Sequence, residues 1–313
     1  MGRKVCDSRS TTGDYIGIDF KSESLRGGEM KIAVSGATGF IGQHIVTELE
    51  KINIAPVLLV RPSSMAALQN KNRILIPLDI HEKLSDSLFK YIGEPDVLIH
   101  CAWSGLPNYQ SLHHFDTELP AQYRLITTLI KNGLKNIVIT GTCFEYGLYS
   151  GALDEMLLPN PNTPYGFAKN ALLQQLQYFQ KNNPFNLTWA RLFYLYGAGQ
   201  THGALRSQIE KAIQNHEPIF HMSGGEQLRD YLLVSKVAEY LIALARLNKN
   251  FGVVNICSGR PISIRKLVET WIMENNWKIK LNLGYYPYVD HEPMAFWGDC
   301  KKLNSCLSLK EVV

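Results

Sequence analysis

The sequence predicts an α/β fold, in which a doubly wound parallel sheet is followed by a smaller C-terminal lobe. Two observations lead to this prediction. Short apolar runs alternate with helical patterns along most of the chain, which is typical of parallel sheets covered by helices on both faces. A turn with three glycines, GATGFIG, joins the first apolar run to the first helical pattern.

Five apolar runs have the length and the β-branched content of buried strands. They are residues 31–35 (KIAVS), 56–60 (PVLLV), 74–78 (ILIPL), 96–102 (DVLIHCA) and 136–140 (NIVIT). Between them, residues 41–52 and 119–134 place apolar side chains three and four positions apart, as an amphipathic helix does. The alternation of these two patterns predicts a parallel sheet.

The second half of the chain is less regular. Residues 163–182 form a helical pattern that begins beside a proline, and residues 186–197 follow as a further strand. More helical patterns come after them, and strand-like pieces at residues 218–222 and 253–258 separate these patterns. The later helical patterns are residues 203–214, 233–247 and 263–275. This tail predicts a smaller lobe that closes over the sheet.

Composition excludes several classes of protein. The chain is 45% hydrophobic, has a net charge of +4 and contains no long basic tract, so nucleic acid is not an expected partner. No apolar run reaches the length of a membrane span, and the first residues lack the apolar stretch of a signal peptide. The six cysteines include no CxxC pair, which favours free thiols in a reducing cytoplasm.

The glycine turn is the first candidate site. Gly36, Gly39 and Gly42 recur at intervals of three, and glycine permits both a positive φ and the close approach of a ligand to the backbone. The helix that follows offers free N–H groups and a positive dipole end to a diphosphate. An ordinary tight turn could show the same glycines, but the first strand of such a sheet is where dinucleotides bind. We therefore predict that this turn, including Phe40 and Ile41, binds a dinucleotide cofactor.

The end of the second apolar run bears on the choice of dinucleotide. An NAD site usually has a carboxylate there to bind the ribose 2′-hydroxyl, whereas this run ends in Arg61. A guanidinium binds a 2′-phosphate well, so NADP(H) is expected ahead of NAD(H), unless Arg61 is a plain surface arginine. After the third run, Asp79 and Ile80 are expected to meet the adenine, although Asp79 could equally cap its loop.

With this site located, the chain divides into three predicted parts. Residues 1–29 are polar and aperiodic and are predicted to be an extension outside the fold, either disordered or artificial. Residues 30–185 are predicted to form the NADP-binding domain of the Rossmann type. Residues 186–313 should supply the last strands of the sheet and a substrate-binding lobe.

A second candidate site lies at the start of the helical pattern at residues 163–182. Tyr165 and Lys169 are four positions apart in YGFAK, so both side chains lie on one face of the helix. A nearby ammonium stabilises a phenolate, and we expect Lys169 to lower the pKa of Tyr165. Tyr165 would then exchange a proton with a carbonyl or hydroxyl group that Thr142 also hydrogen-bonds. Lys169 could also hydrogen-bond the nicotinamide ribose, so both residues of the pair are expected to contact the cofactor. Taken alone, the pair could be a surface pair, and Thr142 a turn residue.

Together these motifs resemble those of the extended short-chain dehydrogenase/reductase family, in its group of NAD(P)-dependent nucleotide-sugar epimerases, dehydratases and reductases. The resemblance extends over residues 30–313. It implies that Thr142 in TGTCFEYG and the YGFAK pair are catalytic, and that Ala102 in LIHCAW lines the cofactor. It also implies that Arg229 of GGEQLRDYLLV binds the diphosphate of the substrate, although Arg229 could instead form an ion pair with a neighbour.

The sequence departs from the pattern of this family at three positions. Trp103 stands where a small residue is usual, and it could narrow the sugar pocket. Tyr194 and Glu118 stand where asparagine is usual. These departures change contacts that the family ordinarily makes with the sugar or the nicotinamide.

The resemblance also sets the expected partners. The substrate would be a nucleotide-diphosphate sugar, and the chain would form a homodimer through its two long helices, at residues 116–133 and 163–182. No metal is expected, because His113 and His114 lack a helical ligand spacing, and His100 lies within an apolar strand as a core residue.

Two reactions fit the resemblance. Dehydratases of this family carry an Asp-Glu pair directly after the catalytic threonine, whereas this chain has Cys143 and Phe144, so dehydration is disfavoured. A 4-ketoreductase of a nucleotide-linked 4-keto-6-deoxysugar and a nucleotide-sugar 4-epimerase remain. An epimerase recycles a tightly held NAD, whereas a reductase draws on NADPH. Arg61 therefore favours the reductase, of the CDP-abequose synthase type that serves bacterial surface polysaccharides.

A non-catalytic dinucleotide-sensing protein is the third alternative. Relatives of that kind usually lose the tyrosine or the lysine of YGFAK. This chain keeps both residues, so the sequence favours an enzyme.

Overall fold

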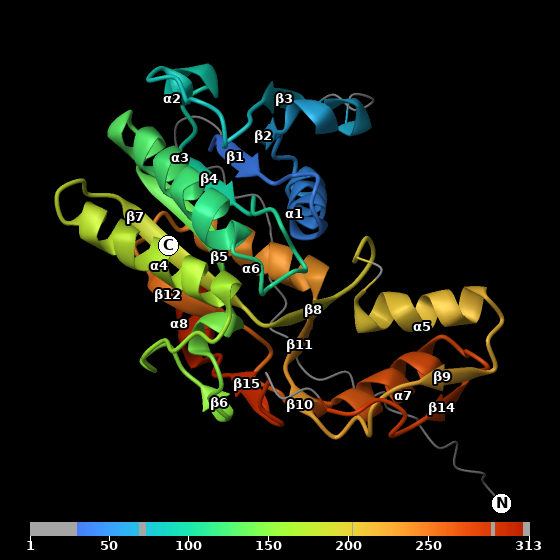
Figure 1. The fold of residues 1–313 in the computed structure, drawn as a ribbon. Helices are drawn as coiled ribbons and strands as arrows, with labels where there is room; N and C mark the ends of the chain where they lie inside the picture. The colour runs from blue at the N-terminus through green and yellow to red at the C-terminus, as the bar shows by residue number, and fades with distance from the viewer. Residues whose placement is uncertain (1–29, 69–72, 202, 289–291, 309–313) are drawn as a thin grey trace, which may run out of the picture.

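The computed structural model of the protein describes residues 30–68, 73–201, 203–288 and 292–308. The prediction made for residues 1–29 lies outside these described residues. Within them, the chain forms a helix-covered sheet that carries a smaller lobe at one end (Figure 1). None of the helices in this part of the chain is both long enough and apolar enough to cross a membrane.

The centre of the fold is a seven-stranded sheet with the order β12-β7-β5-β4-β1-β2-β3. All of its pairings are parallel, and the five predicted strands are confirmed. The strands are β1 (Ile32–Ser35), β2 (Val57–Val60), β3 (Ile74–Pro77), β4 (Val97–His100), β5 (Asn136–Thr142), β7 (Asn186–Leu192) and β12 (Gly252–Ile256). The order reverses between β1 and β4, and an open α/β sheet binds ligands at such a switch point.

Helices cover both faces of the sheet, as the doubly wound prediction requires (Figure 1). One apolar core lies under α1 (Phe40–Lys51), α6 (Val234–Arg246) and α8 (Lys301–Ser308). A second core lies under α2 (Leu88–Tyr91), α3 (Leu119–Lys131) and α4 (Pro164–Gln180) on the opposite face. Side chains alternate between the cores along each strand, so Val34 of β1 joins the first core and Ala33 the second.

The smaller lobe has a core of its own, centred on Trp271, which is 2% exposed. There, α5 (Leu205–Gln214) and α7 (Ile264–Glu274) pack with the parallel pair of β9 (Ile219–His221) and β14 (Lys280–Asn282). Short strand pairs connect the lobe with the sheet domain. They are β8 (Tyr194–Tyr196) with β11 (Tyr231–Leu233), β10 (Leu228–Arg229) with β13 (Ile262–Ser263), and β6 (Gly151–Leu153) with β15 (Phe296–Gly298).

One strand prediction needs correction. Residues 186–197 form two strands, because the chain leaves the main sheet at Phe193 and β8 then pairs with β11. The strand-like piece at residues 253–258 lies in the main sheet as its edge strand, β12, beside β7. The domain boundary at residue 185 stays a prediction.

A buried carboxylate fixes the turn that follows β5. Glu145, in the short helix η3 (Cys143–Tyr146), is 0% exposed. It accepts hydrogen bonds from the backbone N–H of Thr142 (2.8 Å), the indole N–H of Trp189 (2.9 Å) and Nε of Arg191 (2.7 Å). The Thr142 hydroxyl accepts from the backbone N–H of Phe144, which completes a capping box. The turn that carries Thr142 is therefore tied to β7 by a buried ion pair.

Replacing Glu145 with glutamine is expected to lower the free energy of unfolding by about 3–5 kcal/mol, because the charge of Arg191 then stays buried without its counter-charge. Arg191 is 2% exposed, so water cannot replace the lost carboxylate. Urea unfolding measures the change. The matched control is Glu269→Gln, which breaks an exposed ion pair with Arg265 and should change the free energy by less than about 1 kcal/mol. Equal effects of the two variants would contradict this role of burial.

Candidate active site

The glycine turn lies at the carboxyl end of β1, at the switch point of the sheet. Gly36 has a φ of +72°, and a Cβ there would lie 2.7 Å from the backbone nitrogen of Ala102. A Cβ on Gly42 would overlap the carbonyl oxygen of Gly36. The N-cap residue of α1 is Gly39, which has no side chain to cap the helix, and the first turn of α1 contains no acidic residue. The positive end of the helix is therefore open to an anion, and the turn fits the diphosphate of a dinucleotide.

Two cavities meet at this turn. The larger cavity, of about 690 Å³, extends from the glycine turn to Thr142 and Tyr165. The smaller cavity, of about 160 Å³, lies at the ends of β1, β2 and β3. Arg61 lines both. The predicted cofactor residues that line at least one of the cavities are Gly36, Gly39, Phe40, Ile41, Gly42, Arg61, Ile80, Ala102 and Tyr165.

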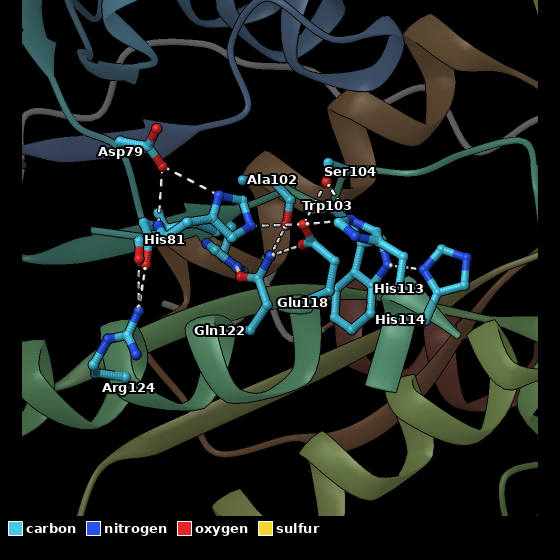
Figure 2. Close-up of polar contacts among 12 residues, drawn as sticks. Asp79, His81, Ala102, Trp103, Ser104, His113, His114, Glu118, Gln122 and Arg124 are labelled. Carbon is cyan, nitrogen blue, oxygen red and sulfur yellow. Dashed lines mark hydrogen bonds and ion pairs between the residues drawn. The ribbon is translucent and has the colours of Figure 1, made fainter. Parts of the chain in front are cut away.

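A hydrogen-bonded cluster borders the smaller cavity (Figure 2). Oδ1 of Asp79 accepts from the backbone N–H of His81 (2.9 Å) and lies 3.1 Å from its Nδ1, so Asp79 caps its own loop and its contact with adenine stays a prediction. Nε2 of His81 lies 2.8 Å from Oε1 of Glu118. Burial opposes ionisation of Glu118, but hydrogen bonds from Ser104, Gln122 and His81 lower its pKa to about 2. The cluster thus ties the end of β3 to the start of α3.

Thr142 and Tyr165 come together on the wall of the larger cavity. Thr142 ends β5, and Tyr165 lies in the first turn of α4, where the Thr163 hydroxyl accepts from the N–H of Gly166. Tyr165 is 8% exposed, and burial raises the pKa of its phenol, while a side-chain hydrogen bond with Thr142 opposes the rise. The expected net lowering of this pKa by Lys169 is therefore wrong, because burial is the larger effect.

Lys169 lies one helical turn further along α4 and is 2% exposed. Its Nζ donates to the carbonyl oxygen of Thr140 (2.8 Å) and lies 4.0 Å from the ring centroid of Trp103. The same nitrogen lies 5.9 Å from the ring centroid of Tyr165. Burial lowers the pKa of Lys169 from 10.5 to about 8, so the amine is still mostly charged at neutral pH. The catalytic roles of Thr142, Tyr165 and Lys169 stay predictions that this grouping fits.

Several residues of the site were not identified from the sequence. Tyr109 and His114 have ring centroids 5.6 and 5.3 Å from that of Tyr165. They lie in the segment between β4 and α3, whose folding back onto α4 no local pattern predicts. Glu145 did have a signal, since Thr142 and Glu145 have the Thr-x-x-Glu spacing of a capping box.

The structure places Arg229 away from the wall of the larger cavity. The side chain is 4% exposed, and its Nη2 donates to Oε2 of Glu292 (2.8 Å). Tyr194, which lines the cavity, donates to the same oxygen (2.8 Å). The ion pair with a neighbour, which the sequence left open, is therefore present. Binding of a substrate diphosphate by Arg229 stays a prediction.

His100 is used in buried hydrogen bonds. His100 is 1% exposed, with Nδ1 at 2.6 Å from the Ser35 hydroxyl and Nε2 at 2.6 Å from Oε1 of Gln122. Burial lowers the pKa of His100 to about 4, so the prediction of a satisfied core histidine is confirmed. Among the residues that the structure describes, no three or more His, Cys, Asp or Glu side chains gather as a metal site would require.

The sequence matches the NAD dependent epimerase/dehydratase family over residues 32–257. It is 30% identical over 272 residues to the dTDP-6-deoxy-L-talose 4-dehydrogenase (NAD(+)) of Aggregatibacter actinomycetemcomitans. The alignment covers 86% of this chain and 99% of that protein. The sequence is 24% identical to the dTDP-4-dehydro-6-deoxyglucose reductase of Escherichia coli, over 76% of this chain and 80% of the relative.

A solved structure, MoeE5 in complex with UDP-glucose and NAD, superposes with a TM-score of 0.74 at 26% identity. The superposition covers 89% of this chain and 92% of that one. The predicted Rossmann-type fold is thereby confirmed.

Replacing Lys169 with methionine is expected to stabilise the protein at neutral pH. The amine loses its proton near pH 8 in the folded protein and near pH 10.5 in the unfolded protein. Its charge therefore lowers the free energy of unfolding below pH 8, and this loss of stability disappears as the pH rises from 8 to 10.5. Lys169→Met should therefore raise the free energy of unfolding by roughly 1–3 kcal/mol at neutral pH, with no gain above the upper pKa. Urea unfolding at several pH values measures this, with exposed Lys181→Met as the control. A less stable Lys169→Met protein at neutral pH would contradict the expectation.

Proposed function

The chain belongs to the NAD-dependent epimerase/dehydratase family, within the extended short-chain dehydrogenases/reductases, and we propose that it is an NADPH-dependent 4-ketoreductase. Its substrate would be a nucleotide-linked 4-keto-6-deoxysugar, a precursor of bacterial surface polysaccharides. The observation that carries the proposal is the protonated phenol of Tyr165 on the wall of the cavity that adjoins the glycine turn. Two relatives named for oxidation or reduction at C4 of a deoxysugar support it.

The protonation state of Tyr165 favours reduction over oxidation. Because burial raises the pKa of the phenol, the oxygen keeps its hydrogen at neutral pH, so the group is present as an acid and not as a base. A ketone gains a proton on its oxygen when it is reduced, whereas an alcohol must lose one when it is oxidised. After the transfer, the phenolate is left near the Lys169 ammonium, which compensates its charge. Thr142 would hydrogen-bond the same substrate oxygen and orient it.

The larger cavity lacks the groups that dehydration needs. No aspartate or glutamate is among the described residues that line it. Elimination of water requires a base for a carbon-bound proton and an acid for the leaving hydroxyl, and the two positions after Thr142 hold Cys143 and Phe144. Burial raises the pKa of the Cys143 thiol, so this group is a poor base as well.

We assign the cofactor to the glycine turn and to the walls of both cavities. The turn leaves its backbone open to a diphosphate, and Ile80 and Ala102 border the smaller cavity, where adenosine would lie. When bound, the dinucleotide supplies the hydride for the carbonyl carbon. Arg61 is exposed and lines both cavities, and its guanidinium suits a 2′-phosphate. This supports NADPH here, whereas the name of the relative from A. actinomycetemcomitans specifies NAD(+).

A nucleotide-sugar 4-epimerase is the second candidate, and the family name itself includes epimerases. An epimerase oxidises C4 and then reduces it with the same bound cofactor, so its phenol must both accept and donate a proton. The raised pKa of Tyr165 makes the first of these steps harder. Arg61 also weighs against it, because a cofactor that is never exchanged has no need of the NADPH pool.

We further propose that the protein is a cytoplasmic homodimer. The helices α3 and α4 pack side by side on one face of the sheet (Figure 1). On α4, Phe167 is 53% exposed and Tyr178 is 70% exposed, which leaves apolar surface for a second copy of the chain.

The enzyme is expected to oxidise one NADPH for each 4-keto sugar that it converts, because reduction consumes the cofactor. A panel of dTDP-, CDP-, GDP- and UDP-linked 4-keto-6-deoxysugars, followed by NADPH absorbance and product NMR, measures the ratio. Tyr165→Phe should lower kcat by about 10²–10⁴-fold, whereas Tyr178→Phe on the exposed side of the same helix should not. Interconversion of C4 epimers without net loss of NADPH would establish the epimerase instead.

Arg61→Ala should shift the cofactor preference. The variant loses the guanidinium that would bind the 2′-phosphate, so kcat/KM for NADPH is expected to fall by about 10–100-fold. NADH has no 2′-phosphate, so kcat/KM for NADH should stay nearly constant. Steady-state kinetics with both cofactors measure this, and Arg265→Ala, on an exposed face of the smaller lobe, is the matched control. A parallel loss for both cofactors would argue that Arg61 does not bind the 2′-phosphate.

A further inference from the structure

Three aromatic side chains line the larger cavity next to Tyr165, and together they form an aromatic wall: Trp103, Tyr109 and Phe144. The ring centroids of Trp103 and Tyr109 lie 5.9 and 5.6 Å from that of Tyr165. The Phe144 centroid lies 4.9 Å from that of Tyr109. The backbone also fixes this wall, since the carbonyl oxygen of Tyr109 accepts from the N–H of Tyr165 (3.1 Å). The phenol therefore meets the cavity between flat, rigid rings.

Trp103 is held from two sides. Its indole N–H donates to Nδ1 of His114 (3.1 Å; Figure 2). An indole nitrogen is only a donor, so Nδ1 is the acceptor, and Nε2 carries the ring hydrogen, which it donates to the carbonyl oxygen of Asn108 (2.9 Å). His114 is 0% exposed, so water cannot replace these bonds. The Lys169 ammonium lies 4.0 Å from the centroid of the same indole ring. Turning Trp103 aside would break both contacts.

A 4-epimerase and a 4-ketoreductase make different demands on such a wall. To invert C4, hydride must leave one face of the carbon and return to the opposite face. The phenol and the cofactor site are fixed in the protein, so the sugar itself must turn over between the two half-reactions. A reductase delivers hydride once, and its rate gains when the ketone is held in a single orientation.

The larger cavity has to hold two groups at once. The larger cavity has about 690 Å³, and in the proposed reaction it receives the sugar together with the nicotinamide end of the cofactor. A volume of ~300–1,000 Å³ is typical of a pocket for one small ligand. Trp103 also borders the smaller cavity, so its indole stands where the two cavities meet. A pyranose ring that turned over in front of Tyr165 would need the space that these rings fill.

We infer that the aromatic wall determines the stereochemical course at C4. It admits a 4-keto pyranose in one orientation and so restricts the enzyme to one product configuration. The inference rests on the proposed function and deepens it. Trp103 contributes most, because its indole is the largest of the three side chains and the most firmly held.

The configuration of the product tests this inference. Trp103→Ala and Tyr109→Ala each remove part of the wall and should give both C4 epimers from one 4-keto substrate, with the minor epimer enriched about tenfold or more over the wild type. Trp103→Ala should also gain slow interconversion of the two finished sugars in the presence of NADP⁺. Trp103→Phe keeps a flat ring and is the matched control, which should give only the wild-type epimer even at a lower rate. Product NMR measures the ratio of epimers, which does not depend on how much of the enzyme is active.

The outcomes separate this inference from the proposed function. If the wild type makes one epimer and both alanine variants still make only that epimer, the inference is overturned and the reductase stands. If the wild type interconverts epimers without consuming NADPH, both are overturned. Because the two alanine variants change independent positions, the failure of one of them to fold leaves the other to decide.

Discussion

The candidate site depends on one buried charge. The Lys169 ammonium is held by the carbonyl oxygen of Thr140 and by the indole face of Trp103, neither of which is an anion. Burial of an ammonium is unfavourable, as the lowered pKa of Lys169 shows. Three elements must therefore converge to hold it: β5 supplies the carbonyl oxygen, the loop after β4 supplies the indole, and α4 carries the lysine. The same convergence brings Tyr165 to the wall of the larger cavity.

Carboxylates stabilise the frame of the site and take no part in its proposed chemistry. Glu145 holds the turn of Thr142 against β7, and Glu118 connects through His81 to the loop after β3. Neither lines the larger cavity, whose described walls offer a protonated phenol, hydroxyl groups and aromatic rings. Such a surface can donate a proton to a ketone and orient it, but it holds no carboxylate to take a proton from carbon. The proposed reduction fits such a surface, whereas elimination, which needs a base for a carbon-bound proton, does not.

Local patterns were enough to predict the frame of the fold, because an apolar run or stripe has to be buried wherever it lies. They were also enough for the pairing of Tyr165 with Lys169, since helical spacing alone puts both on one side of α4. The contact of Trp103 with Lys169 and the pairing of Arg229 with Glu292 join segments far apart in the chain, and no local pattern encodes them. The upward shift of the Tyr165 pKa could not be predicted from a local pattern either, because burial is a property of the tertiary structure.

Transfer of deuterium to the sugar from NADPH that carries two deuterium atoms at C4 of its nicotinamide tests the central claim most directly. If Tyr165 protonates a ketone whose carbon receives the hydride, product NMR should show one deuterium at C4 in a single configuration, and the cofactor should be recovered oxidised. Deuterium spread over both C4 configurations with the cofactor returned in its reduced form would contradict this account. A product without deuterium at C4 would contradict it equally.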